Sequence, residues 1–419
     1  MLDPNPRPAR LFHGWAMLGV STAGVIASSP GQSVVVSQFN MQFRDTLGLS
    51  ASTLSAAYMI GTVAAALPLV YVGKASDRFG PRRSALVITL LFALACASVG
   101  LIRGIATLTL AFFLLRFLGQ GSLSLVSGHM LALWFERRLG FVNGAKLMVS
   151  QLGFATVPAI ALWLIDWIGW QGAYLCLGAG VLALMLPLLL FVARDKPEDL
   201  CQQIDNDPKP TGTNEMAIEE DTAFTLRQAL LSPAYWTIVF TIAINGLIGT
   251  ALIFHCQPLL EWLELDATES ASVLRTWSLT VMVLVFPSGW LADHLAPRTL
   301  LTASAILIGA ASVMPLFWGS LAGVHAAMVA FAASQSLVMG AGAPTIARYF
   351  GRAHHGAIRA VSTKVAVAGT GLGPIVLGLS LDLTGSMTTG LVTFGIICVP
   401  VTVATAMLRP PRPPSAKVV

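Results

Sequence analysis

The sequence predicts an all-α membrane protein with twelve transmembrane helices in two pseudo-symmetric six-helix bundles. Of its 419 residues, 55% are hydrophobic and 11% are charged, whereas soluble domains carry about 25% charged residues. Charged residues are separated by long apolar gaps, such as Arg83 to Arg103 and Arg298 to Arg348, and a bilayer-spanning helix needs about 20 apolar residues. An internal repeat is the third observation. Together they exclude a soluble fold, and the five cysteines, odd in number, exclude a secreted disulfide scaffold.

Six predicted helices make up the N-terminal half. The first follows a polar, proline-rich tail, and we expect it to be retained because it is too long for a signal peptide and lacks a clear cleavage site. The second ends at the basic segment 73–83, the fourth before Arg137 and the sixth before Arg194. The predicted ranges are 12–38, 52–72, 84–102, 107–133, 141–165 and 170–192.

A long polar stretch separates the two halves. Residues 194–232 include nine acidic and four basic residues and the helix breakers Pro208, Pro210 and Gly212, which is typical of a flexible linker. We therefore expect an N-terminal bundle over 1–193, a cytoplasmic linker over 194–232 and a C-terminal bundle over 233–419. The last six helices are predicted at 233–256, 270–291, 299–318, 324–347, 358–380 and 386–407.

The distribution of Lys and Arg predicts the orientation. With the N-terminus inside, the inner loops, the linker and the two tails hold 19 of the 25 basic residues, as expected for cytoplasmic segments. We expect a multi-pass protein of the cell membrane with both termini cytoplasmic. This bias also explains the pI of about 9.1 without a nucleic-acid partner.

The internal repeat relates the halves at an offset of 216 residues. Two homologous halves with the same orientation fit a pseudo-twofold axis along the membrane normal, about which the halves can rock around a central site. The matching pairs are Gly73 and Gly289, Asp77 and Asp293, Arg82 and Arg298, Gly140 and Gly356, Gly153 and Gly369, and Pro158 and Pro374.

Segment 73–83, Gly-Lys-Ala-Ser-Asp-Arg-Phe-Gly-Pro-Arg-Arg, resembles the loop signature between helices two and three of the major facilitator superfamily. Segment 289–298 is a degraded copy of it, and 116–121, Arg-Phe-Leu-Gly-Gln-Gly, resembles the signature of helix four. The resemblance covers the whole chain and implies the major facilitator fold and transport by alternating access.

Three further segments resemble the monocarboxylate and oxalate–formate porter group: Phe-His-Gly-Trp at 12–15, Trp-Phe-Glu-Arg-Arg at 134–138, and Gly373-Pro374 followed by Leu-Asp-Leu-Thr-Gly-Ser at 381–386. That group often has an arginine in helix eight where this chain has Val285. The family's anion-binding role therefore does not transfer directly to that helix.

Charged residues of the loop signature are candidate gating residues. Asp77 can accept hydrogen bonds from a neighbouring helix N-terminus, and Arg78 or Arg82 can pair with a carboxylate. These charges could instead only set the topology at the lipid headgroups. The predicted gating set is Gly73, Asp77, Arg78, Gly80, Arg82, Gly289, Asp293 and Arg298.

Charges predicted within the membrane are all positive: Arg116, Lys146 and Lys364 lie inside helices, and Arg275 lies just inside one. A cation in the membrane usually faces a cavity or an ion path, so we expect an anionic substrate as their partner. Alternatively, Lys146 and Lys364 could reach the lipid phosphates, Arg275 could anchor the interface, and Arg116 could brace packing.

Uncharged side chains complete the predicted binding site. Gln120, Asn245 and Gln335 could hydrogen-bond a substrate or bond between helices, and Tyr58 or Trp277 could form an aromatic wall or belong to the core. No CxxC, HExxH, GxSxG or GxxxxGK[ST] motif is present, and His354-His355 stands alone, so no enzyme activity, cofactor or metal is predicted.

The sequence therefore predicts a secondary transporter for a small organic anion, a mono- or dicarboxylate. A co-transported proton is one option, carried by the substrate, His129 or His255. Efflux of a lipophilic compound and a transporter-like membrane receptor are the alternatives.

Overall fold

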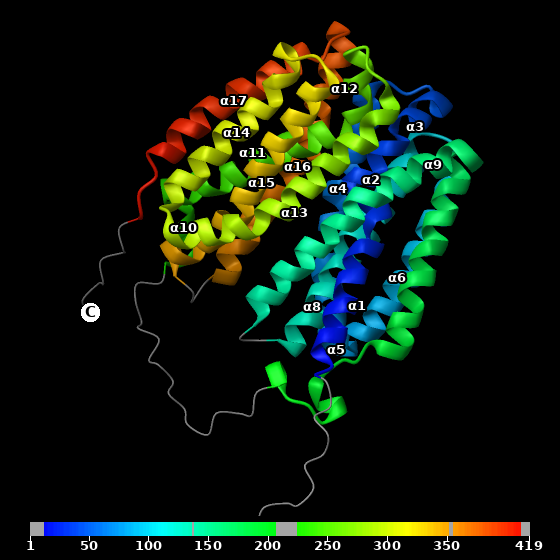
Figure 1. Ribbon diagram of the computed structural model, residues 1–419, viewed down its shortest axis with the longest axis vertical. Coiled ribbons are helices and arrows are strands. Elements are labelled where there is room, and N and C mark those ends of the chain that lie inside the picture. The colour runs from blue at the N-terminus through cyan, green and yellow to red at the C-terminus, as the bar shows by residue number, and fades with distance from the viewer. Residues whose placement is uncertain (1–11, 136–137, 207–223, 352–354, 412–419) are drawn as a thin grey trace, which may run out of the picture.

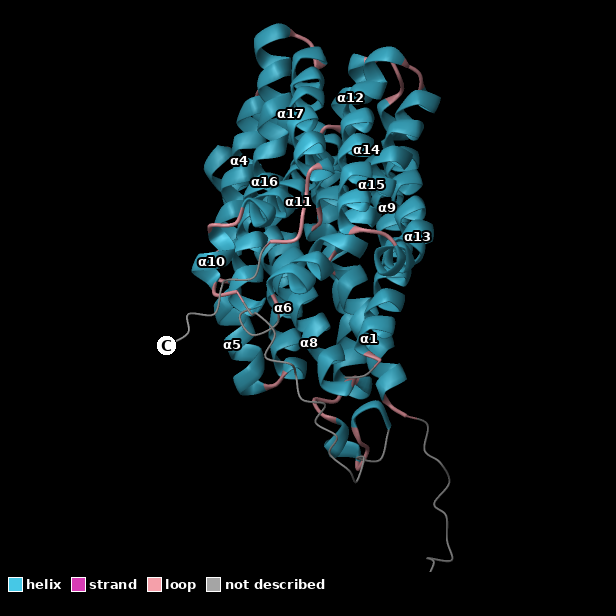
Figure 2. Cartoon of the chain, turned by 90° about the vertical axis from the view of Figure 1, so that its left-hand side faces the viewer, coloured by secondary structure: helices cyan, strands magenta, loops and turns pink. Residues whose placement is uncertain are grey.

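The computed structural model describes residues 12–135, 138–206, 224–351 and 355–411. Within these ranges all regular structure is helical (Figures 1 and 2). The N-terminal half holds α1 (Gly14–Ala27), α2 (Ser33–Val36), α3 (Asn40–Leu47), α4 (Ala51–Ala66), α5 (Leu69–Phe79), α6 (Pro81–Ser98), α7 (Ile105–Leu114), α8 (Ser124–Trp134) and α9 (Leu139–Pro187). The C-terminal half holds α10 (Leu226–Leu230), α11 (Pro233–Phe254), α12 (Cys256–Trp262), α13 (Ser270–His294), α14 (Pro297–Phe317), α15 (Leu321–Phe350), α16 (His355–Thr384) and α17 (Thr388–Ala406).

Ten helices of the described chain are long and apolar enough to cross a membrane. One of them, Phe141–Val192, has 52 residues, more than twice the roughly 20 that a bilayer requires, and it turns at Gly169, where φ is 75°. This turn falls between the predicted fifth and sixth helices. The 52-residue helix therefore counts as two crossings, which makes eleven. The first predicted helix is the twelfth, and it is not among the ten because its regular part ends at Ala27.

The expectation of one continuous first helix over 12–38 was wrong. The helix stops at Ala27, and a 3₁₀ turn, Ser29–Gly31, precedes α2. Pro30 has no amide proton to donate, and the Ser28 hydroxyl bonds back to the Val25 carbonyl at 2.6 Å. Both effects favour a break in the middle of the bundle.

The predicted repeat is visible in the helix boundaries. Helices α6 and α14 begin at Pro81 and Pro297, and α9 and α16 begin at Leu139 and His355, each pair 216 residues apart. Gly153 of α9 packs against Ile26 of the first helix, and Gly369 of α16 packs against Ala243 of α11. Equivalent glycines therefore allow equivalent close contacts in the two halves.

The two bundles lie together at one end of the molecule and diverge towards the other (Figure 1). We call the first end, which carries α3 and α12, the α12 end, and the opposite end, which carries α5 and α10, the α5 end. Figure 2 shows the helices of both bundles running along the long axis between these ends. Across the halves, α4 packs against α16 and α9 packs against α13.

Candidate functional site

Arg116 lies in the widened, π-helical turn Leu115–Leu123 between α7 and α8, and its residue surface is 5% exposed. A guanidinium Nη1 donates to the Ser33 hydroxyl at 3.0 Å, and that oxygen lies 2.7 Å from the Tyr58 hydroxyl. The guanidinium carbon lies 5.1 Å from the centre of the Tyr58 ring. In the described chain no carboxylate lies within salt-bridge distance of Arg116, so neutral groups alone hold this buried charge.

The break in the first helix places Ser33 beside Arg116. A Cβ built on Gly31 would overlap the carbonyl oxygen of Leu115, and it would lie 3.2 Å from the Cα of Gly119. Only glycine allows the two backbones to approach this closely. Gly31 and Gly119 therefore position the hydroxyl that Arg116 contacts.

A cavity of about 190 Å³ lies between the two halves next to Ser33. Both halves line it with uncharged polar groups and aromatic rings. Its walls are formed by Gln32, Ser33, Val34, Gln120, Phe154, Asn245, Gly246, Gly249, Thr250, Ile253, Trp277, Phe331, Gln335 and Thr370.

The C-terminal wall of this cavity is held in place by its own hydrogen bonds. The Trp277 indole N–H donates to the Gln335 side-chain oxygen at 2.9 Å, and the Asn245 amide donates to Ser334 at 2.6 Å. The Trp277 ring stacks on Phe331 with the ring centres 5.8 Å apart. Since the side-chain oxygen of Gln335 already accepts from Trp277, the side-chain N–H groups of Gln335 are the donors that it can offer to the cavity.

Arg116 itself lines a second cavity, of about 380 Å³. Gln120 and Thr370 line both cavities, and the Gln120 side-chain oxygen is buried without a hydrogen-bond partner. Arg116 therefore faces one cavity directly and reaches the other through Ser33. The remaining walls of the second cavity are Thr62, Ala65, Ala66, Leu69, Gly121, Ser124, Leu125 and Val367.

Of the predicted substrate ligands, Arg116, Gln120, Asn245 and Gln335 line these cavities, whereas Tyr58 is fully buried behind Arg116. Sequence reasoning missed Ser33, Thr250, Phe331 and Thr370 as cavity residues. The Pro30-Gly31 break could have pointed to Ser33, because an unwound segment inside a membrane protein normally lines a cavity.

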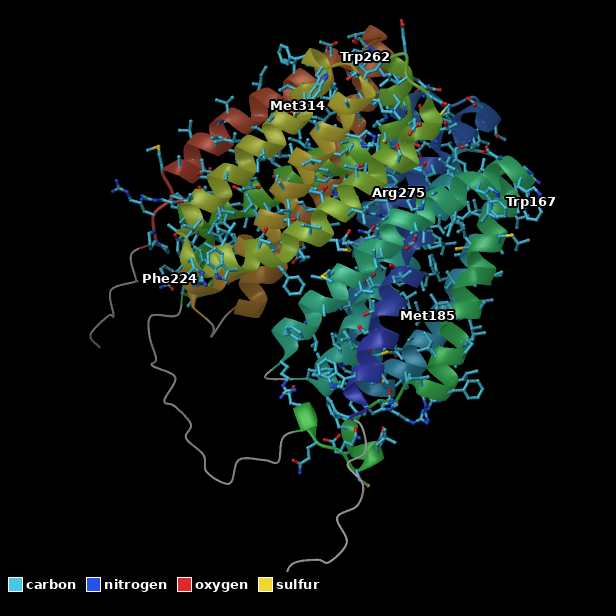
Figure 3. The ribbon with its side chains drawn as sticks, viewed as in Figure 1. Trp167, Met185, Phe224, Trp262, Arg275 and Met314 are labelled. Carbon is cyan, nitrogen blue, oxygen red and sulfur yellow. The ribbon has the colours of Figure 1, made fainter. Side chains whose placement is uncertain are left out.

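The other three predicted cations lie elsewhere. Lys146 on α9 is buried, at 8% exposure, beside Gly128 of α8. Arg275 is exposed on α13, where that helix runs alongside α9 (Figure 3). Lys364 is exposed on α16. None of the three lines either cavity described above.

The predicted gating residues of the first half remain within that half. Asp77, at the end of α5, lies 3.6 Å from His129 of α8. The Arg82 side chain donates to the carbonyls of Leu189 and Leu190 at 2.7 and 2.8 Å, and Arg78 lies over Phe79. Gly80 takes a φ of 86° at the turn between α5 and α6, while a Cβ added at Gly73 would meet nothing within 4 Å.

In the second half, the backbone of Gly289 packs closely against Gly340, and Arg298 is exposed. The side chain of Asp293 lies outside the described part of the structure.

Hydrogen bonds join the halves at the α12 end. The Asp382 carboxylate accepts from the backbone amides of Ala51 and Ser52 at 3.1 and 2.7 Å. Asn40 donates to the Phe254 carbonyl at 2.6 Å, and His255 lies between Ser55 and the Pro374 carbonyl. Ser270 donates to Gln38 at 2.8 Å. Asp382 lies just after the predicted helix 358–380 and is not among the predicted gating residues.

Comparisons with known proteins agree with this architecture. A bacterial homologue of the human lysosomal transporter Spinster, in its inward-facing and unoccupied conformation, superposes with a TM-score of 0.66 at 17% identity, covering 96% of this chain and 93% of that one. The occupied inward-facing form gives the same TM-score at 16% identity, with 96% and 92% covered. These likenesses concern the fold.

One curated relative is named a probable sulfoacetate transporter and comes from Cupriavidus necator. It is 26% identical over 156 residues, which are 37% of this chain and 36% of that protein. The family model of the Major Facilitator Superfamily matches residues 16–274, more than half of the chain. The predicted family, and the prediction of a transporter rather than an enzyme, are confirmed: this multi-pass membrane protein belongs to the major facilitator superfamily.

Proposed function

We propose that this transporter moves a small organic anion across the cell membrane by alternating access, driven by gradients and with both termini cytoplasmic. The observation that carries the proposal is Arg116: a buried guanidinium at the junction of two cavities between the halves, with neutral neighbours. An arginine cannot be neutralised in practice, and its planar fork matches a carboxylate or sulfonate. A bound anion would supply the missing counter-charge.

The size and polarity of the cavity next to Ser33 narrow the class of substrates that the protein can bind. Its volume of about 190 Å³ is below the range of about 300–1,000 Å³ typical of pockets for drug-sized ligands. Asn245 and Gln335 line its C-terminal wall, and Arg116 lines the neighbouring cavity of about 380 Å³, which shares Gln120 and Thr370 with it. A compact anion with a second polar end fits this arrangement. The relative's named substrate, sulfoacetate, carries a sulfonate and a carboxylate on two carbons, so sulfonated acids belong beside mono- and dicarboxylates.

The hydrogen bonds at the α12 end support the assignment of a transport state. If the termini are cytoplasmic, the α12 end is the outer side, and the halves are joined there by Asp382, Asn40 and His255. Transport then requires these bonds to break while the α5 end closes. We assign the structure to an inward-facing state on this basis.

A thermal-shift screen of small carboxylates and sulfonated carboxylates against the purified protein tests the substrate class. A ligand at about 100 times its Kd stabilises the folded state by about 2.7 kcal/mol. We expect at least one such anion to raise the Tm of the wild type but not of Arg116→Gln. Arg275→Gln, which removes an exposed arginine, is the matched control and should respond as wild type does. Stabilisation of Arg116→Gln equal to wild type would remove Arg116 from the site.

A further inference from the structure

His129 of α8 and Asp77 of α5 meet at the α5 end of the N-terminal half. The His129 Nε2 lies 3.6 Å from an Asp77 carboxylate oxygen, and Nδ1 lies 2.7 Å from the Ser76 hydroxyl. The side chain of His129 is 24% exposed and that of Asp77 is 73% exposed. Both ring nitrogens therefore face polar groups of α5, and water can reach the pair.

We propose that His129 and Asp77 form a proton-binding site that keeps the α5 end open when His129 is protonated. The inference rests on the alternating access of the proposed function and not on the identity of the anion. Asp77 belongs to the loop signature, and its pairing with His129 keeps its carboxylate on its own half. To contribute to closure of the α5 end, the carboxylate has to leave His129.

The contacts of the ring suit two protonation states. In the neutral ring, Nε2–H faces Asp77 and Nδ1 accepts from the Ser76 hydroxyl, which can rotate to donate. When a proton binds, Nδ1–H donates to the same hydroxyl, and the imidazolium faces the carboxylate as a charge-assisted pair. The protonated ring thus gains an ionic partner in this state and would lose it when Asp77 leaves.

Several other charged groups lie on the elements packed against α8. The elements packed against α8 carry Lys74, Asp77 and Arg78 on α5, Arg82 and Arg83 on α6, Arg116 on the π-helical turn Leu115–Leu123, Lys146 and Asp166 on α9, and Asp205 on the 3₁₀ turn Ile204–Asn206. Arg82 is engaged with the carbonyls of Leu189 and Leu190. Asp166 lies near the Gly169 turn, at the opposite end of the bundle. Among the described contacts of His129, Asp77 is the acidic one.

The direction of the effect follows from proton linkage. A state that binds a proton more tightly is favoured as the pH falls. Histidine titrates between about pH 5 and pH 8, so acid should favour the open α5 end and alkali should favour its closure.

Distance measurements between spin labels on the two halves test this proposal without any substrate. Labels at Arg138→Cys and Thr299→Cys, both exposed positions, report on the α5 end once the exposed Cys176 and Cys201 are replaced by serine. When the pH is lowered from about 8 to about 5.5, we expect the ratio of long to short distances between the labels to rise at least about threefold in the wild type. His129→Gln, which cannot be protonated, should abolish this rise.

Two further variants make the outcome decisive. Asp77→Asn removes the carboxylate and should also abolish the rise, so the test does not depend on one variant. His325→Gln is the matched control, because the His325 ring bonds to the Thr276 hydroxyl at 2.8 Å, as His129 bonds to Ser76. It should keep the rise. A distribution that does not change with pH in the wild type, or a rise that persists in His129→Gln, would overturn the proposal, whatever the anion screen shows.

Discussion

The carboxylate of Asp382, near the end of α16, accepts a hydrogen bond from the backbone amide of Ser52, in the first turn of α4, at 2.7 Å. The second carboxylate oxygen accepts from Ala51. An anion at a helix N-terminus is stabilised by the free amides and by the helix dipole. Because the two helices belong to different halves, this interaction can be present only while the α12 end is closed.

We predict that Asp382→Asn shifts the protein towards opening of the α12 end. A carboxylate at a helix N-terminus contributes about 0.3–1 kcal/mol, and 1 kcal/mol corresponds to about a fivefold change in an equilibrium. Spin labels at Thr46→Cys and Thr389→Cys, exposed positions on the two halves, should show more of the longer distance.

Asp266→Asn is the control for Asp382→Asn. Asp266 also accepts from a backbone amide, that of Thr268 at 2.9 Å, but within its own half. That hydrogen bond lowers the pKa of the Asp266 carboxyl, so the control also removes an ionised group. Equal distance distributions in Asp382→Asn and the control would show that Asp382 does not hold the halves together.

We predict that Gly31→Ala impairs anion binding although it removes no polar group. Its new Cβ would overlap the Leu115 carbonyl, and relief of such overpacking costs about 1–3 kcal/mol. The shift would move Ser33 away from Arg116. Gly19→Ala, where a Cβ would meet nothing within 4 Å, should bind normally. Normal binding by Gly31→Ala in the same titration would argue against a site that depends on this backbone contact.

We predict that Gln335→Glu weakens anion binding at least about tenfold, or about 1.4 kcal/mol. The new carboxylate can still accept from the Trp277 indole, so the shape of the cavity is preserved while a negative charge is added to it. Gln335→Met, similar in size and uncharged, should bind more tightly than Gln335→Glu. Isothermal titration of both variants measures the difference, and equal affinities would mean that the anion does not reach this wall.

We predict near-normal behaviour for Lys364→Gln. The lysine is exposed on α16 and lines neither cavity, and surface substitutions usually change free energies by at most about 0.5 kcal/mol, about twofold in affinity. Lys364→Arg should behave in the same way. A tenfold loss of affinity in the glutamine variant would return Lys364 to the binding site.

Much of the fold could be predicted because the bilayer constrains it strongly. Apolar length and the spacing of charges located the membrane-spanning helices, and the 216-residue repeat predicted boundaries that α6 and α14 share. Periodicity could not predict where a helix departs from regular geometry. The break at Ser29–Gly31 arises from the local effects of Ser28 and Pro30, which periodicity does not register, and the π-helical turn at Leu115–Leu123 packs closely against it.

The candidate site could be predicted only in part, because charge indicates which residues need a partner but not which way they face. Arg116 was distinguished by its depth in a helix, and the structure places it at the cavities. Arg275 and Lys364 had similar sequence surroundings but lie exposed. Asp382 could not be identified as a link between the halves, since its partners, Ala51 and Ser52, are more than 300 positions away in the sequence and bond through their backbone.

Uptake of a labelled organic anion into proteoliposomes tests the central claim, that Arg116 is the positive charge on which transport depends. We predict uptake by the wild type and by Arg275→Gln, more than about a tenfold loss in Arg116→Lys, because an ammonium lacks the bidentate fork, and none above background in Arg116→Ala. All four proteins should insert equally, which quantification of reconstituted protein checks. Wild-type uptake by Arg116→Ala would contradict the account.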